Sequence, residues 1–151
     1  MALIDGTTGN DILNGTVDAD VSNGLAGDDG LSGFAGNDSL DGGDGNDSLE
    51  GGAGNDTLVG GNGTDVAFYF NATAGVNVNL ATGLATGGAG ADSLKGIESV
   101  VGSFYNDVLV GDAEANTLSG GMGNDSISGG GGNDTLIGGG GKDTIDGGGG
   151  Q

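Results

Sequence analysis

The sequence predicts an all-β protein built as a solenoid, in which short strands stack on one another along the length of the molecule. Three observations support this fold class. A nine-residue unit recurs through most of the chain, as in residues 33–59, which read GFAGNDSLD GGDGNDSLE GGAGNDTLV. Each of these units carries one large aliphatic residue, at its eighth position, inside a three-residue segment that suits a short strand. The chain has no proline, so no residue interrupts a ladder of backbone hydrogen bonds.

Each unit divides into a turn and a strand. Its first six positions are rich in Gly, Asn and Asp, which turn easily because Gly and Asn accept a positive φ. The three residues that follow alternate in direction, so Leu40, Leu49 and Leu58 point to one side and their neighbours to the other. One leucine cannot support a strand alone, and we expect stacked units to align these residues into an interior column.

The first repeat block covers residues 1–65, and its register holds without a break from Gly6 to Phe68. The unit at residues 15–23, GTVDADVSN, is the weakest, because Asp18 replaces the fourth-position glycine and Ser22 stands at the aliphatic position. The sixth-position acids of this block are Asp11, Asp20, Asp29, Asp38, Asp47, Asp56 and Asp65.

Residues 66–101 depart from the repeat. Val76 and Val78 alternate with asparagines, which predicts a strand with one buried face, and residues 96–101 (GIESVV) read as another strand. One unit recurs at residues 87–95, GGAGADSLK, with Asp92 at its sixth position. We expect longer strands in wider coils of the same stack, with a small aromatic cluster at residues 68–70. A separate subdomain is the alternative.

The second repeat block covers residues 102–151 and completes a single domain of residues 1–151. Its sixth positions are Asp107, Asn116, Asp125, Asp134 and Asp143. Tyr105 and Glu114 replace the fourth-position glycine in its first two units. The chain begins with the half-unit ALID after Met1 and ends with the half-unit GGGGQ, and the two together make one nonapeptide.

The charge balance calls for an external cation. Twenty-two acids face two lysines, for a formal net charge of −20, and the chain has no Arg and no His. Internal salt bridges cannot neutralise these carboxylates, and twelve of the twenty-two stand at the sixth position of a unit. Carboxylates and the exposed carbonyls of glycine-rich turns suit calcium, which takes six to eight oxygen ligands, better than magnesium. Zinc and copper favour nitrogen or sulfur ligands, and the chain has no Cys or His.

Composition also argues against several classes of function. The N-terminus has no basic region or apolar core of a cleaved signal peptide, and no apolar run reaches membrane-spanning length. An acidic chain without Arg is a poor nucleic-acid binder. We expect no enzyme, because the acids follow the phase of the repeat rather than forming a tuned catalytic pair.

The units resemble the glycine- and aspartate-rich nonapeptide of RTX proteins, GGxGxDxUx, where U is aliphatic. Seven of them stand in unbroken register. The resemblance implies a parallel β-roll, a right-handed β-solenoid in which two units make one coil and several calcium ions lie between stacked turns. Each ion would be shared by turns two units apart and held by backbone carbonyls and sixth-position carboxylates. The metal ligands that it implies are Asp11, Asp20, Asp29, Asp38, Asp47, Asp56, Asp65, Asp92, Asp107, Asp125, Asp134 and Asp143. Asn116 offers only a neutral oxygen, so its site should be weaker.

These features predict an extracellular, calcium-dependent structural protein in which binding and folding are one event. Type I-like export would not need a cleaved signal. Neither end carries an obvious cap, and the complementary half-units predict head-to-tail self-association into a filament or a surface or matrix assembly. Each subunit would add about eight coils of about 4.8 Å, or about 40 Å. The alternative is a calcium-triggered folding and secretion module of a larger type I-secreted protein.

Overall fold

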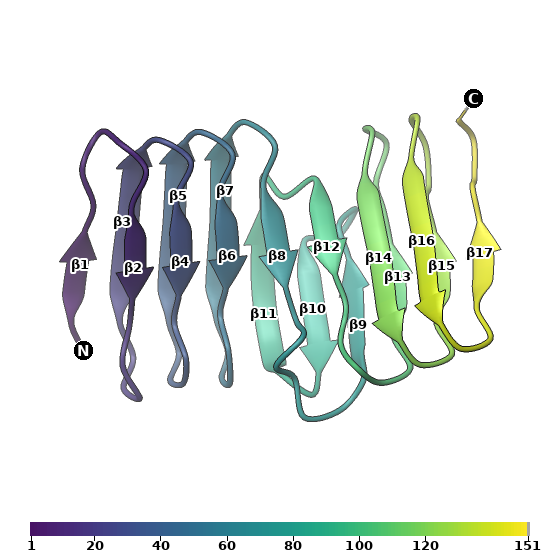
Figure 1. Ribbon diagram of the computed structural model, residues 1–151, viewed down its shortest axis with the longest axis horizontal. Coiled ribbons are helices and arrows are strands. Elements are labelled where there is room, and N and C mark those ends of the chain that lie inside the picture. The colour runs from purple at the N-terminus through teal and green to yellow at the C-terminus, as the bar shows by residue number, and fades with distance from the viewer. Residues whose placement is uncertain (151) are drawn as a thin grey trace.

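The computed structural model describes residues 1–150, and within them the chain forms seventeen β-strands and no helix. The strands lie in two sheets that face each other along an elongated molecule, with the N- and C-terminal coils at opposite ends (Figure 1). The predicted all-β solenoid is therefore confirmed. None of the described residues forms a helix that could cross a membrane.

Outside residues 76–95, the chain passes alternately through a ten-stranded and a seven-stranded sheet. In spatial order, the ten-stranded sheet contains β1 (Leu3–Asp5), β3 (Val21–Ala26), β5 (Ser39–Asp44), β7 (Thr57–Asn62), β11 (Gly90–Lys95), β10 (Leu84–Gly87), β9 (Val76–Asn79), β13 (Val108–Val110), β15 (Ser126–Ser128) and β17 (Thr144–Asp146). The seven-stranded sheet contains β2 (Ile12–Asn14), β4 (Gly30–Ser32), β6 (Ser48–Glu50), β8 (Val66–Phe68), β12 (Ser99–Val101), β14 (Thr117–Met122) and β16 (Thr135–Gly140).

The register within each repeat block equals two units. Leu40 of β5 pairs with Leu58 of β7, and Leu31 of β4 pairs with Leu49 of β6, so parallel neighbours stand 18 residues apart (58 − 40 and 49 − 31). One coil therefore consists of two nine-residue units, one strand in each sheet. Because every strand meets the same position of the next coil, like residues stack in rows along the molecule.

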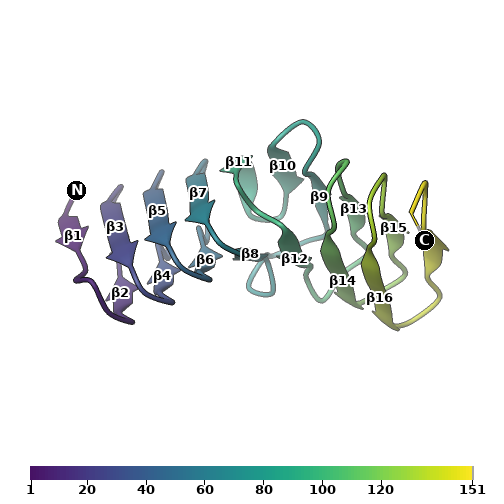
Figure 2. The same cartoon turned by 90° about the horizontal axis from the view of Figure 1, so that it is seen from above.

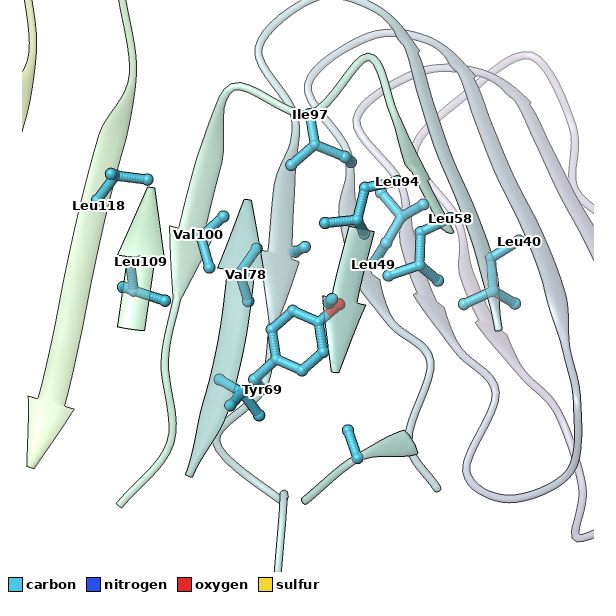
Figure 3. Close-up of a cluster of buried hydrophobic side chains, with 14 of the residues drawn as sticks. Leu40, Leu49, Leu58, Tyr69, Val78, Leu94, Ile97, Val100, Leu109 and Leu118 are labelled. Carbon is cyan, nitrogen blue, oxygen red and sulfur yellow. The ribbon is translucent and has the colours of Figure 1, made fainter. Parts of the chain in front are cut away.

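The core is a column of eighth-position side chains between the two sheets. Leu40, Leu49 and Leu58 are fully buried, and Leu109 and Leu118 continue the column in the second block (Figure 3). Burial of one aliphatic side chain per strand is the hydrophobic contribution that this thin core offers, about 1.5–3 kcal/mol each. Ser22 is also fully buried in the column, and its hydroxyl has no hydrogen-bond partner. The weakest unit of the sequence is thus a weak point of the core.

The middle of the chain contains an antiparallel meander that the sequence pattern did not predict. β9 and β10 have four residues each, and β10 pairs antiparallel with both β9 and β11. β11 then pairs in parallel with β7, with Thr57 opposite Ser93, an offset of 36 residues (93 − 57). β9 pairs in parallel with β13 of the second block. The meander therefore puts three strands where the alternating pattern has one, and it rejoins the stack on both sides.

The aromatic residues separate between the core and the surface. Tyr69 is buried among Val78, Leu94 and their neighbours (Figure 3). Phe68 and Phe70 form an edge-to-face pair with ring centroids 5.7 Å apart, and Phe70 is exposed. At the C-terminal end, β17 is exposed along its whole length. Gln151, the last residue of the expected half-unit, lies outside the described residues.

Candidate metal sites

The first six positions of the units form two rows of turns, one along each edge of the roll (Figures 1 and 2). In β3, β5, β7, β14 and β16 the strand extends through the first three of these positions. Each turn ends in its sixth-position residue, and the strand that follows holds this residue in place through its own hydrogen bonds. Nine of the twelve predicted ligands are buried in this way, namely Asp20, Asp29, Asp38, Asp47, Asp56, Asp65, Asp92, Asp107 and Asp125. Asp11, Asp134 and Asp143 are partly buried. Because the acids recur at one position of the repeat, the fold places them in two internal rows of carboxylates.

One oxygen of most of these carboxylates belongs to a hydrogen-bonded ladder. The backbone N–H of Asp29 donates to Oδ1 of Asp47 at 2.8 Å, one coil further on. The same bond recurs along both rows at 2.7 to 3.0 Å, from Asp11 to Asp29, Asp20 to Asp38, Asp38 to Asp56, Asp47 to Asp65, Asp107 to Asp125, Asn116 to Asp134 and Asp125 to Asp143. The ladder fixes the orientation of each side chain, so that its second oxygen points to a defined place.

That second oxygen has no partner at most of these positions. Within residues 1–150, Oδ2 is buried without a hydrogen bond in Asp29, Asp38, Asp47, Asp56, Asp65, Asp125 and Asp134. A buried ionised oxygen that is left unpaired is strongly unfavourable. An arrangement that repeats this condition seven times fits a ligand of opposite charge.

The first-position glycine leaves room beside this oxygen. A Cβ placed on Gly42 would stand 2.2 Å from Oδ2 of Asp47 and 2.7 Å from the carbonyl oxygen of Gly60 in the next coil. Real Cβ atoms do not approach other atoms this closely, so the position requires glycine. Two oxygens from successive coils therefore converge on the space that the missing side chain leaves, and the same arrangement recurs at Gly24, Gly33 and Gly120. Gly102 has the same two neighbours, but there Oδ2 of Asp107 accepts the Ser103 N–H.

Burial makes these carboxyls reluctant to ionise in the folded chain. It raises the pKa of Asp56 to about 6, with Asp92 and Asp38 adding repulsion. Burial also raises the pKa of Asp38, Asp47, Asp65, Asp92 and Asp125. Asp20 differs, because the Ala2 N–H and the Thr16 hydroxyl donate to it and lower its pKa. Hydrogen bonds from the protein thus outweigh burial at Asp20, whereas at the others burial outweighs the single ladder N–H.

These shifts predict that acid partly replaces calcium. Because the folded-state pKa of Asp56 lies above the unfolded value near 3.8, the folded chain binds more protons between the two values. Without calcium, stability should rise as the pH falls from 7.5 through about 6 towards 5, and calcium affinity should fall over the same range. Far-UV circular dichroism in chelator at both pH values tests the first effect. A calcium titration at both pH values tests the effect on calcium affinity. Equal β-sheet signals in chelator and equal calcium midpoints at the two pH values would contradict the prediction.

The structure also places residues at these rows that the repeat did not single out. Oε2 of Glu98 accepts the Asp65 N–H at 2.9 Å, in the place of the next sixth-position aspartate. The buried Tyr69 phenol lies against Asp92, without a partner at hydrogen-bond distance. Thr7, Thr16 and Ser103 donate to the carboxylates of Asp11, Asp20 and Asp107. Ser or Thr at the second position is a turn signal that the sequence does contain, whereas Glu98 is out of phase with the repeat.

The donor set fits calcium. Within residues 1–150, no place gathers three or more His, Cys, Asp or Glu side chains. An ion on these rows would therefore be held by sixth-position carboxylates together with backbone carbonyls, an all-oxygen set of the kind that calcium accepts. When bound, the ion supplies two positive charges to oxygens that the fold otherwise leaves uncompensated.

Comparison with protein families gives a match over most of the chain. The model of the RTX calcium-binding nonapeptide repeat matches four times, at residues 3–31, 32–67, 101–136 and 119–151. It leaves out residues 68–100, the part that contains the meander. Comparison with curated proteins gave no match. The matched residues include every sixth-position aspartate of the two carboxylate rows except Asp92, and the chain is a member of the RTX calcium-binding nonapeptide repeat family.

Proposed function

We propose that this protein is an extracellular structural protein that is disordered without calcium and folds into the β-roll as it binds the ion. The observation that carries the proposal is the set of seven buried Oδ2 atoms without a partner. The chain has a net charge of −20 and only two lysines, so compaction brings the carboxylates close to one another without enough positive charge to offset their repulsion. Calcium removes that obstacle, so ion binding and folding become one event.

The calcium affinity expected of such sites supports an extracellular location. Extracellular calcium modules bind with dissociation constants of about 10⁻⁴–10⁻³ M. A site in this range is empty at cytosolic calcium levels and filled outside the cell, so the chain would stay unfolded until export. The sixth-position carboxylates are engaged in the ladder, which supports a structural rather than a catalytic role.

Far-UV circular dichroism and small-angle X-ray scattering test this function directly. In chelator we expect the spectrum and dimensions of an expanded chain, and in millimolar calcium a β-rich rod. Magnesium at the same concentration, and sodium chloride at matched ionic strength, are the controls for charge screening. Identical spectra in chelator and calcium would reject the proposal.

We further propose that the folded rolls stack head to tail. At one end of the described roll β1 and β2 form open sheet edges, and at the other β16 and β17 do so (Figure 1). Because β17 lies half a coil beyond β16, a second roll fits without a gap when its β1 meets β16 and its β2 meets β17. That register sets Ile4 beside Leu136 and Leu13 beside Ile145, which extends the aliphatic column. The other pairing, β1 with β17, would set Asp5 beside Asp146 and leave a gap in the smaller sheet.

Stacking predicts different outcomes for two exposed isoleucines of the last coil. Ile145, at 48% exposure, lies in the column, whereas Ile137, at 49%, faces outward from β16. We expect Ile145→Lys to prevent filaments in calcium and Ile137→Lys to leave them unchanged, as seen by electron microscopy. If the parent protein stays as short monodisperse rods at high concentration, stacking is wrong, and the secretion-module alternative is favoured.

A further inference from the structure

Eleven turns of this roll, all but 87–92 and 138–143 among the complete units, are of two kinds, which differ at the second position of the unit. In the first kind, called open here, the second residue has a positive φ and Oδ2 of the sixth-position aspartate is buried without a partner. The turns that meet both conditions have their second residues at Leu25, Phe34, Gly43, Gly52, Gly61, Gly121 and Gly130.

In the second kind, called closed, the backbone N–H of the second residue donates a hydrogen bond to a side-chain oxygen of the sixth-position residue. The Thr16 N–H donates to Oδ2 of Asp20 at 2.7 Å, and its hydroxyl donates to the same atom at 2.8 Å. The Asp18 N–H donates to the Thr16 hydroxyl at 3.1 Å and so fixes the side chain. The same pair of backbone bonds recurs in turns 6–11, 102–107 and 111–116, where Thr7, Ser103 and Asp112 hold the second position.

The difference reverses the polarity of the group beside the carboxylate. In a closed turn an N–H points at the sixth-position side chain and provides the positive end of a dipole. A positive φ belongs to the flipped form of the peptide, as in the pair of turn types I and II, and in the open turns the same N–H makes no bond to the carboxylate. An open turn therefore needs a cation, and a closed turn has already satisfied the oxygen that would bind one.

We infer that the four closed turns, 6–11, 15–20, 102–107 and 111–116, bind no calcium and form without it, and that the second-position side chain selects this state. The inference rests on the proposed calcium function. It proposes hydrogen-bonded turns in place of three of the expected ligand positions, Asp11, Asp20 and Asp107, and of the weak Asn116 position.

Two residues show that glycine is not what makes a turn open. Leu25 and Phe34 adopt φ values of 79° and 70°, which are unfavourable for residues with a Cβ. Their turns nevertheless take the open form. What Thr7, Thr16, Ser103 and Asp112 share, and what Leu25 and Phe34 lack, is a side-chain oxygen that accepts the fourth-position N–H.

The closed turns occupy a regular place in the chain. Turns 6–11 and 15–20 lie on opposite edges of the first coil, and turns 102–107 and 111–116 do the same at the start of the second block. Each block thus begins with one complete coil whose turns need no ion. Open turns follow in both blocks. Calcium binding at these turns would therefore add coils to a first coil that forms without the ion.

Two reciprocal substitutions test the inference by counting ions. Thr7→Gly converts GTTGND into GGTGND, which has every feature of an open turn, and the carbonyl of Gly24 already lies beside Gly6. Gly121→Thr converts GGMGND into GTMGND, the pattern of the first closed turn. We expect native mass spectrometry in saturating calcium to find one more ion per chain in the first variant and one fewer in the second.

Thr8→Gly and Met122→Thr are the matched controls, because each introduces the same residue one position further along the same unit, at an exposed position. Both should bind the parent number of ions. Parent-like counts in Thr7→Gly overturn the inference, whether or not Gly121→Thr folds. A parent chain that binds no calcium at all would instead reject the proposed function, so the two failures are distinguishable.

Discussion

The Gly42→Ala variant is expected to lose calcium-induced structure in the coils around residues 42–47. The new Cβ would stand 2.2 Å from Oδ2 and 2.6 Å from Cγ of Asp47, and 2.7 Å from the carbonyl oxygen of Gly60. The carboxylate of Asp47 is held in the ladder by its other oxygen, Oδ1, and the Gly60 carbonyl belongs to the backbone. The variant must displace either the carboxylate or the next coil, and forced overpacking of this kind destabilises by about 1–3 kcal/mol.

Gly30→Ala is the control for this variant. Gly30 begins β4, its φ is not in the left-handed region, and the nearest atom to an added Cβ is the Asp11 carbonyl oxygen at 4.0 Å. Alanine there should be neutral or stabilise by up to about 1 kcal/mol, since glycine weakens a strand. Calcium titrations followed by circular dichroism, with urea unfolding at saturating calcium, measure both effects. A Gly42→Ala protein with the parent midpoint would show that the space beside Asp47 is not where the ion binds.

The repeat predicts those features that depend on a constant offset between neighbours. Leu40 lies opposite Leu58 and Asp29 contacts Asp47 because both pairs are 18 residues apart, and a strict nine-residue period contains that distance. The interior column and the two carboxylate rows could therefore be expected from the sequence.

Where the period fails, the partner of a strand is no longer encoded by spacing. β11 sits beside β7 at an offset of 36 residues, and β10 runs antiparallel between β11 and β9. The unit at 87–95 kept the phase of the first block, which indicated that it belongs to the same stack but not that a hairpin precedes it. Glu98 occupies a ladder position by reaching in from a segment that has no repeat at all.

The closed turns illustrate a different limit. Thr16 and Gly43 both stand at the second position of a unit, and the family pattern treats the first as an imperfect copy of the second. Physically they are alternatives, because the Thr16 N–H and hydroxyl hold the oxygen that the Gly43 turn leaves without a partner. A deviation from the repeat is therefore informative when its side chain can make a hydrogen bond that replaces a ligand.

The Asp47→Asn variant is expected to have opposite effects with and without calcium. The amide oxygen can still accept the Asp29 N–H, which is 2.8 Å from Oδ1, so the ladder is retained. The buried charge is lost, however, and with it the pKa shift that burial causes at Asp47. Without calcium the variant should be no less folded than the parent at neutral pH, because a buried, unpaired carboxylate has been removed. In calcium it should bind more weakly, by at least the tenfold to hundredfold loss that is roughly typical when a group supporting a metal ligand is removed.

Asp28→Asn provides the matched control, since it makes the same chemical change on an exposed side chain of the preceding turn in the same row. Oδ1 of Asp28 accepts the Asn46 N–H at 2.9 Å. Asn10, one coil earlier in the same row, accepts the Asp28 N–H in the same way, so asparagine is compatible with this bond. Its calcium affinity should stay close to that of the parent, because only a solvated charge is lost. Calorimetric titration of both variants separates two explanations of calcium-dependent folding. Equal losses would mean that calcium acts by general screening of a polyanion, whereas a loss confined to Asp47→Asn would locate its action at the buried oxygens between successive coils.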